Sequence, residues 1–285
     1  MGNRVALQHT TSYQYERAVA FGPQKIQLCP APGGRTPILS YALEVRPADR
    51  LLHWQFDPLG NRLARVILPS KTAEFVVEVR LEADLTPYNP FDFFVEPAYA
   101  QFPFVYDGEA AELLGLYLAT EPAGPLLAEF VAGLSRETTD TVSFLLASNR
   151  AVRDRVGYTT RLEHGVQRCE ETLALGTGSC RDSSWLLVQV FRRLGIAARF
   201  VSGYLIQVAN DAPDGPKVDS ADLHAWVEVY LPGAGWIGLD PTSGLLTAEG
   251  HIPLVCTPSA SQAAPIGGTV EPAEVRMEHT MAVTR

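Results

Sequence analysis

Alternating side chains predict several strands in the first part of the chain. Residues 4–15 carry their larger side chains at every second position, which places these side chains on one face of an extended strand. The same period recurs in three later runs, at residues 39–45, 52–56 and 75–83. Turn-forming residues fill positions 57–61 between two of these runs. We therefore expect residues 1–85 to form an N-terminal antiparallel β-sandwich.

The pattern changes after this region. In residues 86–108 prolines alternate with aromatic side chains, so neither a strand ladder nor a helix can continue. We expect this connecting segment to pack along the seam between two domains, because so many rings are costly to leave in water. Apolar residues then recur with a helical period over 113–156, and β-rich runs return beyond residue 200. The order of these elements predicts an α+β fold with residues 109–285 as the second domain.

Composition and charge exclude several classes of function. Apolar residues make up 46% of the 285 and charged residues 19%, which is the profile of a globular protein and not of a disordered one. Lys and Arg number 23 against 32 Asp and Glu, and the net charge of -9 disfavours binding to nucleic acid or to anionic lipid. The sequence has no apolar run long enough to cross a membrane, and no leader pattern precedes the first strand. We therefore expect a cytoplasmic protein with no nucleic-acid or membrane partner, and the edge strands at its N-terminus leave room for a homodimer.

One of the four cysteines occupies a position that favours a nucleophile. A glycine-rich turn at 176–178 leads into an apolar helical run, with Ser179 as a good N-cap and Asp182 three residues further on. Cys180 then takes the first helical position, where free backbone N–H groups and the positive end of the helix dipole favour the thiolate. Its backbone N–H is also a donor that an oxyanion can use. The other three cysteines are scattered through a chain too large to need disulfides, and we expect them to be mostly reduced.

A histidine and an aspartate further along the chain complete a set of catalytic groups. His224 lies in a strand-like run and shares one face of it with Trp226. If residues 231–235 form a hairpin bend, Trp226 is opposite Asp240, and Asp240 then lies one diagonal step from His224 on the same face. A carboxylate one diagonal step away, on the same face of the sheet, can fix the tautomer of the imidazole.

The motifs around these residues resemble those of the bacterial transglutaminase-like superfamily. Four segments match in order and spacing, at residues 178–182, 199–204, 224–226 and 239–242. The resemblance implies a papain-like transglutaminase core as the catalytic domain, with Cys180 as nucleophile, His224 as general acid/base and Asp240 as the residue that orients the histidine. The β-rich start of the chain and the segment 89–94 are similar to the N-terminal region of bacterial members described as cysteine proteases.

Four further residues are candidates for binding substrate or an oxyanion. Gln167 or Tyr158 could supply a second oxyanion donor beside the N–H of Cys180. Arg181 either binds a substrate carboxylate in a bidentate manner or is a solvated side chain at the helix start. Trp226 lies beside His224 in the same strand and is a candidate for contact with substrate.

The sequence argues against a metal or a cofactor. Four residues that could bind zinc lack the close paired spacing that starts such a site, namely His164, Cys169, Cys180 and His224. The remaining histidines have no acidic or thiol neighbour at a mechanistic spacing, and we expect them to be surface or structural residues: His9, His53, His251 and His279. The calcium sites of eukaryotic cross-linking transglutaminases are absent from this sequence, and Ser179 and Arg181 stand where those enzymes have Gln and Trp.

The sequence therefore predicts a cysteine-dependent hydrolase, a protease, peptidase or amidase acting on a peptide or protein substrate. Its Cys-His-Asp triad cleaves a peptide or amide bond through a thioester acyl-enzyme. Two alternatives stay open, namely acyl transfer to an amine and a non-catalytic peptide-binding protein of the same fold.

Overall fold

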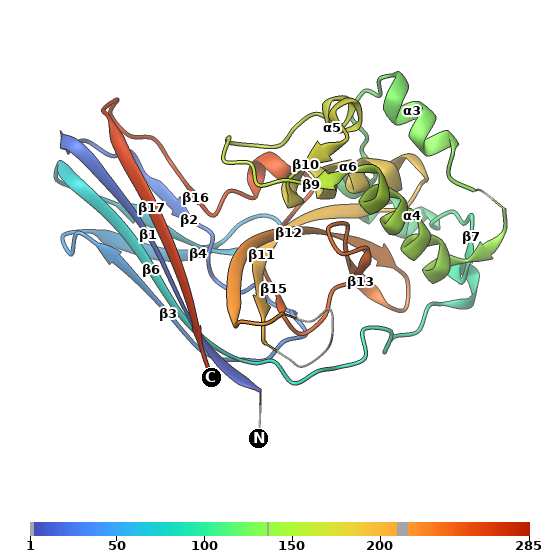
Figure 1. Ribbon diagram of the computed structural model, residues 1–285, viewed down its shortest axis with the longest axis horizontal. Coiled ribbons are helices and arrows are strands. Elements are labelled where there is room, and N and C mark those ends of the chain that lie inside the picture. The colour runs from blue at the N-terminus through green and yellow to red at the C-terminus, as the bar shows by residue number, and fades with distance from the viewer. Residues whose placement is uncertain (1–2, 136, 210–215) are drawn as a thin grey trace.

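The computed structural model describes residues 3–135, 137–209 and 216–285, and its first part is built from two four-stranded antiparallel sheets (Figure 1). The strands of this part run in chain order β1 (Arg4–Val19), β2 (Gln24–Ile26), β3 (Ile38–Arg46), β4 (Leu51–Phe56), β5 (Arg62–Ile67) and β6 (Thr72–Asp84), and β16 (Ile266–Gly267) and β17 (Val275–Thr284) join them. One sheet has the order β17-β1-β6-β3 and the other β16-β2-β5-β4. The predicted N-terminal β-sandwich is confirmed.

Alternation along the strands explains how these sheets form a core. In β1, Val5 and Leu7 are buried while their neighbours are exposed, as the period of two requires. Buried residues of both sheets belong to one hydrophobic cluster, and the rings of Tyr41 in β3 and Trp54 in β4 meet edge to face with centroids 6.1 Å apart. The turn between β4 and β5 is held by the Asp57 carboxylate, which accepts the backbone N–H of Asn61 at 2.8 Å.

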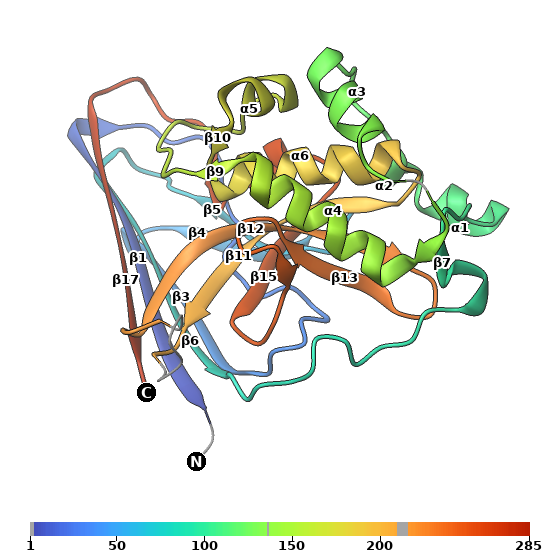
Figure 2. The ribbon, with the colours of Figure 1, turned by 45° about the vertical axis from the view of Figure 1, so that its right-hand side comes forward.

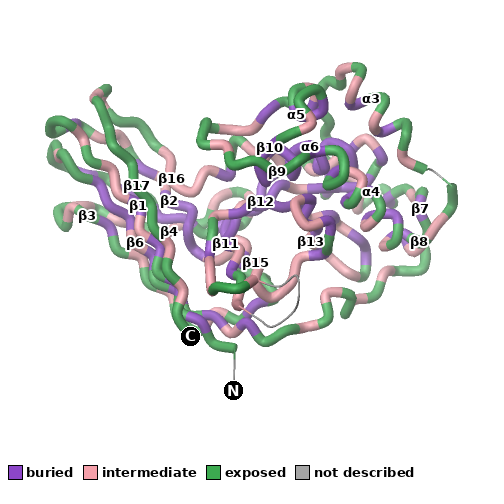
Figure 3. The backbone as a smooth tube through the Cα atoms, viewed as in Figure 1, coloured by how far each residue is buried: buried purple, intermediate pink, exposed green. Residues whose placement is uncertain are grey.

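The second part of the chain is a five-stranded antiparallel sheet covered by helices. Its order is β14-β13-β12-β11-β15. These strands are β11 (Ala198–Gln207), β12 (Ser220–Leu231), β13 (Gly235–Asp240), β14 (Leu245–Leu246) and β15 (His251–Thr257). Helix α6 (Cys180–Arg193) packs on β11 and β12, and Figure 3 shows that both α6 and β12 are largely buried. A buried helix against a buried sheet gives this half of the molecule its core.

Shorter elements surround α6, as Figure 2 shows from a second direction. The helices are α1 (Gly108–Leu113), α2 (Gly115–Leu118), α3 (Pro125–Ala132), α4 (Thr141–Arg155) and α5 (Cys169–Leu175), with one-turn 3-10 helices at Pro97–Tyr99 and Ala260–Gln262. Two strand pairs of two residues each complete the set, β7 (Gln101–Phe102) with β8 (Thr139–Asp140) and β9 (Gly157–Tyr158) with β10 (Thr177–Gly178). Among the described residues, none of the helices has the length and apolarity that a membrane crossing requires.

The last strand returns to the first domain. β17 pairs with β1 along ten positions, from Tyr15 opposite Val275 to Ala6 opposite Thr284, and β16 pairs with β2. The predicted second domain, residues 109–285, therefore contains two strands that complete the sheets of the N-terminal sandwich. The period of two in the sequence predicts a strand at 275–283 but does not say which strand it pairs with, because pairing is set by how the whole chain folds.

The connecting segment 86–108 packs as its composition suggests, in two places. Near its start, Tyr88 and Phe93 line a cavity together with residues of both domains. Near its end, the Tyr106 hydroxyl donates to the carbonyl of Tyr230 at 2.6 Å, and the Phe102 ring stacks on Phe144 of α4. The first part of the segment thus lies at the seam between the domains, and the second part covers the helical side of the second domain.

Candidate active site

The nucleophile candidate sits at the start of α6, where one carboxylate organises the turn. The Asp182 carboxylate accepts the backbone N–H and the hydroxyl of Ser179, at 2.8 and 2.7 Å, which closes the cap that places Cys180 at the first helical position. Arg161 donates to the same carboxylate at 2.9 and 3.1 Å, and the backbone N–H of Gln167 donates at 2.7 Å. Burial disfavours the charge on Asp182, but these hydrogen bonds outweigh burial and lower its pKa. The cap is therefore ionised and rigid.

The histidine and aspartate reach the site from adjacent strands. Leu231 is opposite Gly235 in the β12–β13 hairpin, and the register continues through Val227 opposite Leu239. The predicted hairpin register is thus the observed one. His224 Nε2 and Asp240 Oδ2 lie 3.1 Å apart, and both side chains are buried.

The three candidate groups come together at one wall of a cavity. Asp240 holds the His224 ring through Nε2, and Cys180 lines the same cavity as His224, close enough for its side chain to help raise the pKa of the imidazole. Burial disfavours the imidazolium, but the hydrogen bond with Asp240 and the nearby Cys180 outweigh it and raise the pKa of His224 from 6.5 to about 10. Burial likewise opposes the charge on Asp240, yet the hydrogen bond with His224 and the nearby His251 hold its pKa far below the usual range. The histidine is therefore charged at neutral pH and oriented by an ionised carboxylate.

A second histidine, which the sequence analysis placed among surface or structural residues, shares this carboxylate. His251 at the start of β15 brings its Nε2 to 3.5 Å from Asp240 Oδ2. Its Nδ1 accepts the backbone N–H of Ala248 at 3.2 Å, so in the neutral ring the proton lies on Nε2 and faces the carboxylate. No spacing in the sequence could reveal this, because it depends on β15 pairing with β11 at the far side of the sheet from β13.

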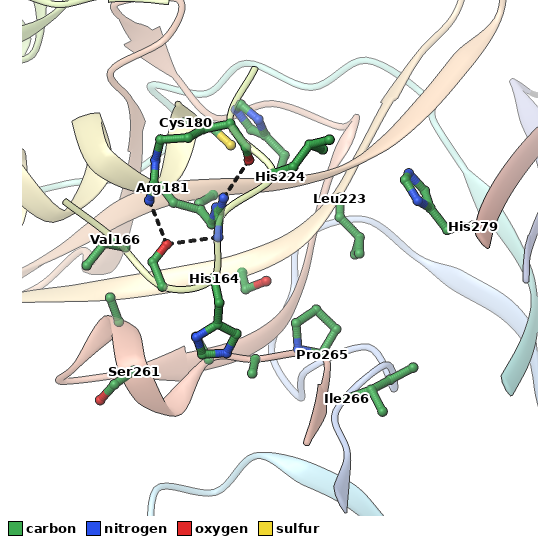
Figure 4. Close-up of a pocket in the computed structure, with 18 of the residues that line it drawn as sticks. His164, Val166, Cys180, Arg181, Leu223, His224, Ser261, Pro265, Ile266 and His279 are labelled. Atoms are coloured by element: carbon green, nitrogen blue, oxygen red, sulfur yellow. Dashed lines mark hydrogen bonds between the residues drawn. The ribbon is translucent and has the colours of Figure 1, made fainter. Parts of the chain in front are cut away.

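Cys180 and His224 open onto a cavity of ≈ 370 Å³ between the two domains (Figure 4). On one side the cavity is lined by the loop from Arg161 to Val166 and by the segment from Ala260 to Ile266. The other side is the N-terminal sandwich, which contributes residues of β1 and β17: His9, Thr11, Tyr13, Met277 and His279. The first domain is thus a wall of the candidate site.

A buried hydrogen bond joins the domains beside this cavity. His9 Nδ1 in β1 lies 2.8 Å from the Tyr204 hydroxyl in β11, and His9 Nε2 lies 3.0 Å from the Thr11 hydroxyl. Burial, helped by the charge of His279, lowers the pKa of His9 to about 4, so the ring is neutral near pH 7. A neutral histidine with a hydrogen bond at each ring nitrogen fixes the position of the N-terminal sandwich relative to the second domain.

Two of the four weaker candidates have structural partners. Three donor contacts of the Arg181 guanidinium go to backbone carbonyls of the 161–165 loop, at 2.7 to 3.0 Å, as the dashed lines in Figure 4 show in part. Gln167 is buried and does not line the cavity, and its side-chain carbonyl accepts the Thr172 hydroxyl at 3.0 Å. Arg181 thus lines the cavity while holding its loop, and Gln167 supports the cap.

Tyr158 and Trp226 lie on different sides of the triad. Tyr158 is exposed on β9 beside β10, it does not line the cavity, and partial burial together with Cys180 raises its pKa. Trp226 is buried, its ring stacks on His224 with centroids 6.4 Å apart, and its edge meets His251 at 5.2 Å. It lines a separate cavity of ≈ 470 Å³ instead of the one that Cys180 opens onto.

One group of side chains has the composition of a metal site. Within the described parts of the chain, only His224, Asp240 and His251 place three ligand atoms within 4.8 Å of one another. Both histidines already face the same Asp240 oxygen, at 3.1 and 3.5 Å, so a metal ion held by all three would displace them from the carboxylate. The zinc set weighed from the sequence, around Cys169 and His164, does not come together in this way.

Family comparisons agree with this architecture. Residues 128–241 match the Transglutaminase-like superfamily, and residues 5–84 match the Bacterial transglutaminase-like N-terminal region. The resemblance inferred from the sequence motifs is thereby confirmed, as is the order of the two regions.

Some relatives extend over most of the chain and others match it only locally. An uncharacterized protein of Mycobacterium tuberculosis is 29% identical over 277 residues, covering 88% of this chain and 82% of its own. A protein-glutamine gamma-glutamyltransferase of Pseudomonas aeruginosa is 39% identical over 66 residues, which cover 23% of this chain and 10% of its own. The crystal structure of a candidate cysteine protease from Cytophaga hutchinsonii shares the fold, with a TM-score of 0.65 at 19% identity over 99% of this chain and 91% of its own.

Proposed function

We propose that this chain, whose residues 128–241 carry a transglutaminase-like core, is a cysteine-dependent hydrolase that cleaves a peptide or amide bond. The observation that carries the proposal is that Cys180 and His224 line the same open cavity while Asp240 holds the His224 ring at 3.1 Å. A thiol, an imidazole and a carboxylate in this order are the parts of a covalent acyl-transfer mechanism.

Acylation follows from the protonation states of these groups. The Cys180 thiolate attacks the carbonyl carbon, and a carbon–sulfur bond forms as the carbonyl π electrons move onto oxygen. The backbone N–H of Cys180, which has no intrahelical acceptor at the first helical position, donates to that oxyanion, and the Tyr158 hydroxyl is our candidate for the second donor. The His224 imidazolium gives its proton to the amide nitrogen as the carbon–nitrogen bond breaks, which leaves a thioester and a neutral amine.

Deacylation reverses the role of the histidine. Neutral His224 takes a proton from water, the hydroxide adds to the thioester carbon, and the carbon–sulfur bond breaks to give a carboxylic acid and the thiolate. An amine entering in place of water would give a new amide and release the same thiolate. The local identity with a protein-glutamine gamma-glutamyltransferase favours this second outcome, and we retain acyl transfer to an amine as the alternative function.

Alkylation and turnover together test the proposal. Iodoacetamide near pH 7 is expected to label Cys180 in preference to the other three cysteines, because burial raises the pKa of their thiols, and Cys180→Ala should abolish labelling and amide hydrolysis. Asp240→Asn should lower kcat on the order of 10³–10⁴-fold, because the amide no longer orients a charged imidazole. Cys29→Ala is the matched control, since Cys29 lines neither cavity.

The products distinguish the two reactions. Hydrolysis releases a free carboxylic acid even in the presence of a primary amine, whereas acyl transfer incorporates that amine into the product. Uniform labelling of all four thiols, with hydrolysis that survives Cys180→Ala, would remove the basis of the proposal.

A further inference from the structure

The cavity that Cys180 opens onto has an unusual charge composition for an acidic protein. The chain carries 32 Asp and Glu, yet none of the described residues that line the cavity is acidic. Besides the nucleophile, the titratable residues of the lining are two arginines, four histidines and one tyrosine: Arg161, Arg181, His9, His164, His224, His279 and Tyr13. The rest of the lining is mainly apolar, with Leu223, Ile266 and Met277 among its larger side chains.

Two carboxylates close to this wall interact with Arg161 and do not line the cavity. Asp182 is fully buried under Arg161, and the solvent-exposed Glu163 lies 3.6 Å from the same guanidinium. Arg181 differs, because its guanidinium donates to backbone carbonyls and no carboxylate pairs with it within the described residues. Its charge therefore faces the cavity without a counter-ion.

Two histidines stand at opposite walls of the cavity. His164 belongs to the 161–165 loop of the second domain, and His279 lies in β17 of the sandwich (Figure 4). Both are exposed, and neither side chain makes a hydrogen bond within the described parts of the chain. They offer donors to a ligand from the two sides, while a cationic ligand would meet no acceptor of opposite charge.

Resting on the proposed function, we propose that the cavity selects an acyl donor whose segment beside the scissile carbonyl is apolar and carries a neighbouring carboxylate, and that it rejects basic segments. The apolar lining takes up the hydrophobic side chain. The uncompensated guanidinium and the imidazole donors favour an anion, and a lysine or arginine in the same place would lose its hydration without gaining a partner.

Peptidyl alkylating agents test this selectivity without requiring turnover. We would measure second-order rates of Cys180 modification by N-iodoacetyl-Leu-Glu-amide, N-iodoacetyl-Leu-Gln-amide and N-iodoacetyl-Leu-Lys-amide, each relative to iodoacetamide. The glutamate reagent should react at least about fivefold faster than the lysine reagent, with glutamine between them, and added salt should reduce the difference. Equal rates, a preference for lysine or no modification of Cys180 by any reagent would overturn the proposal.

Charge-reversal variants locate the source of the preference. His279→Glu and His164→Glu should each reduce or invert the glutamate-to-lysine ratio, while His53→Glu, at an exposed position outside both cavities, should leave it unchanged. An unchanged ratio in both cavity variants would contradict the assignment even if the wild-type preference holds. The hydrolase proposal has its own failing outcome: selective alkylation of Cys180 is observed, but no acyl-enzyme forms with an amide substrate.

Discussion

The Asp240 carboxylate contacts two histidines and a backbone N–H of the candidate site. Its Oδ2 faces both His224 and His251, and its Oδ1 accepts the backbone N–H of Thr242 at 2.8 Å. Because each contact favours the ionised form, the carboxylate stays charged and holds the imidazolium in place. The reactivity of the site thus depends on a residue that touches no substrate.

The raised pKa of His224 predicts a difference between turnover and alkylation at alkaline pH. The folded-state pKa of about 10 lies above the ordinary value of 6.5, so the proton that protonates the leaving amine is present at neutral pH and is lost as the pH rises through 10. Amide turnover should therefore fall above about pH 9–10, whereas alkylation of Cys180, which needs only the thiolate, should not. Stopped assays at fixed ionic strength measure both, and a parallel decline in the two rates would argue against His224 as the acid.

The three candidate residues were predictable from the sequence, but the neighbouring His251 was not. A helix-cap motif predicts the position of Cys180, and the hairpin register predicts that of Asp240. Both rules are local in the sequence. His251 belongs to a strand whose partner, β11, lies some 50 residues earlier in the chain, and no local rule relates it to Asp240.

Among the secondary-structure elements, α6 depends most on a single buried ion pair. Asp182 bonds Ser179 inside the helix cap and Arg161 from the preceding loop, so the start of α6 and the cavity loop are tied together. The position of the nucleophile is therefore coupled to the loop that lines the cavity.

Removing the Asp182 carboxylate should lower the stability of the folded protein. Asp182→Asn removes the buried partner of the largely buried Arg161, which keeps only its longer pair with the exposed Glu163, and we expect a loss of roughly 3 kcal/mol in the free energy of unfolding. The pKa of Asp182 is lowered in the folded state, so its contribution is present above the unfolded pKa and disappears as the pH falls through the folded one. Asp154→Asn, which breaks an exposed pair with Arg153, is the control and should cost at most about 1 kcal/mol. Equal denaturation midpoints for both variants would refute the assignment.

Long, regular elements were predictable and short ones were not. The alternating runs that predict β1, β3, β4 and β6 are strands in the structure. β5 was missed because two adjacent residues, Leu63 and Ala64, are both buried, which breaks the period of two. The seven-residue helix α5 is too short for a helical period to show.

At the scale of the whole molecule, the two domains are joined at both ends of the chain. β17 completes the sheet of β1, and its end is tied to the second domain by the ion pair between Arg285 and Asp219. Met277 and His279 of the same strand line the cavity. The sequence predicts the strand, but its pairing partner is a property of the folded chain.

Deletion of residues 275–285 should therefore affect stability and selectivity together. The truncation exposes the edge of β1 along ten paired positions, so we expect a lower melting temperature and a tendency to aggregate. It also removes Met277 and His279, so the preference of Cys180 for the acidic alkylating peptide should weaken. Deletion of Arg285 alone breaks an exposed pair with Asp219 and an exposed hydrogen bond to the Ala209 carbonyl, and it should change the melting temperature little. Thermal unfolding at fixed protein concentration, followed by the alkylation series, makes the comparison.

The most direct test of the central claim is intact-mass spectrometry after brief incubation with a peptide mixture, followed by peptide mapping. A covalent acyl group on Cys180 that disappears on standing in water, and that does not form in His224→Ala, is the expected result. A protein that gains no acyl mass, or gains it at another residue, would contradict the account.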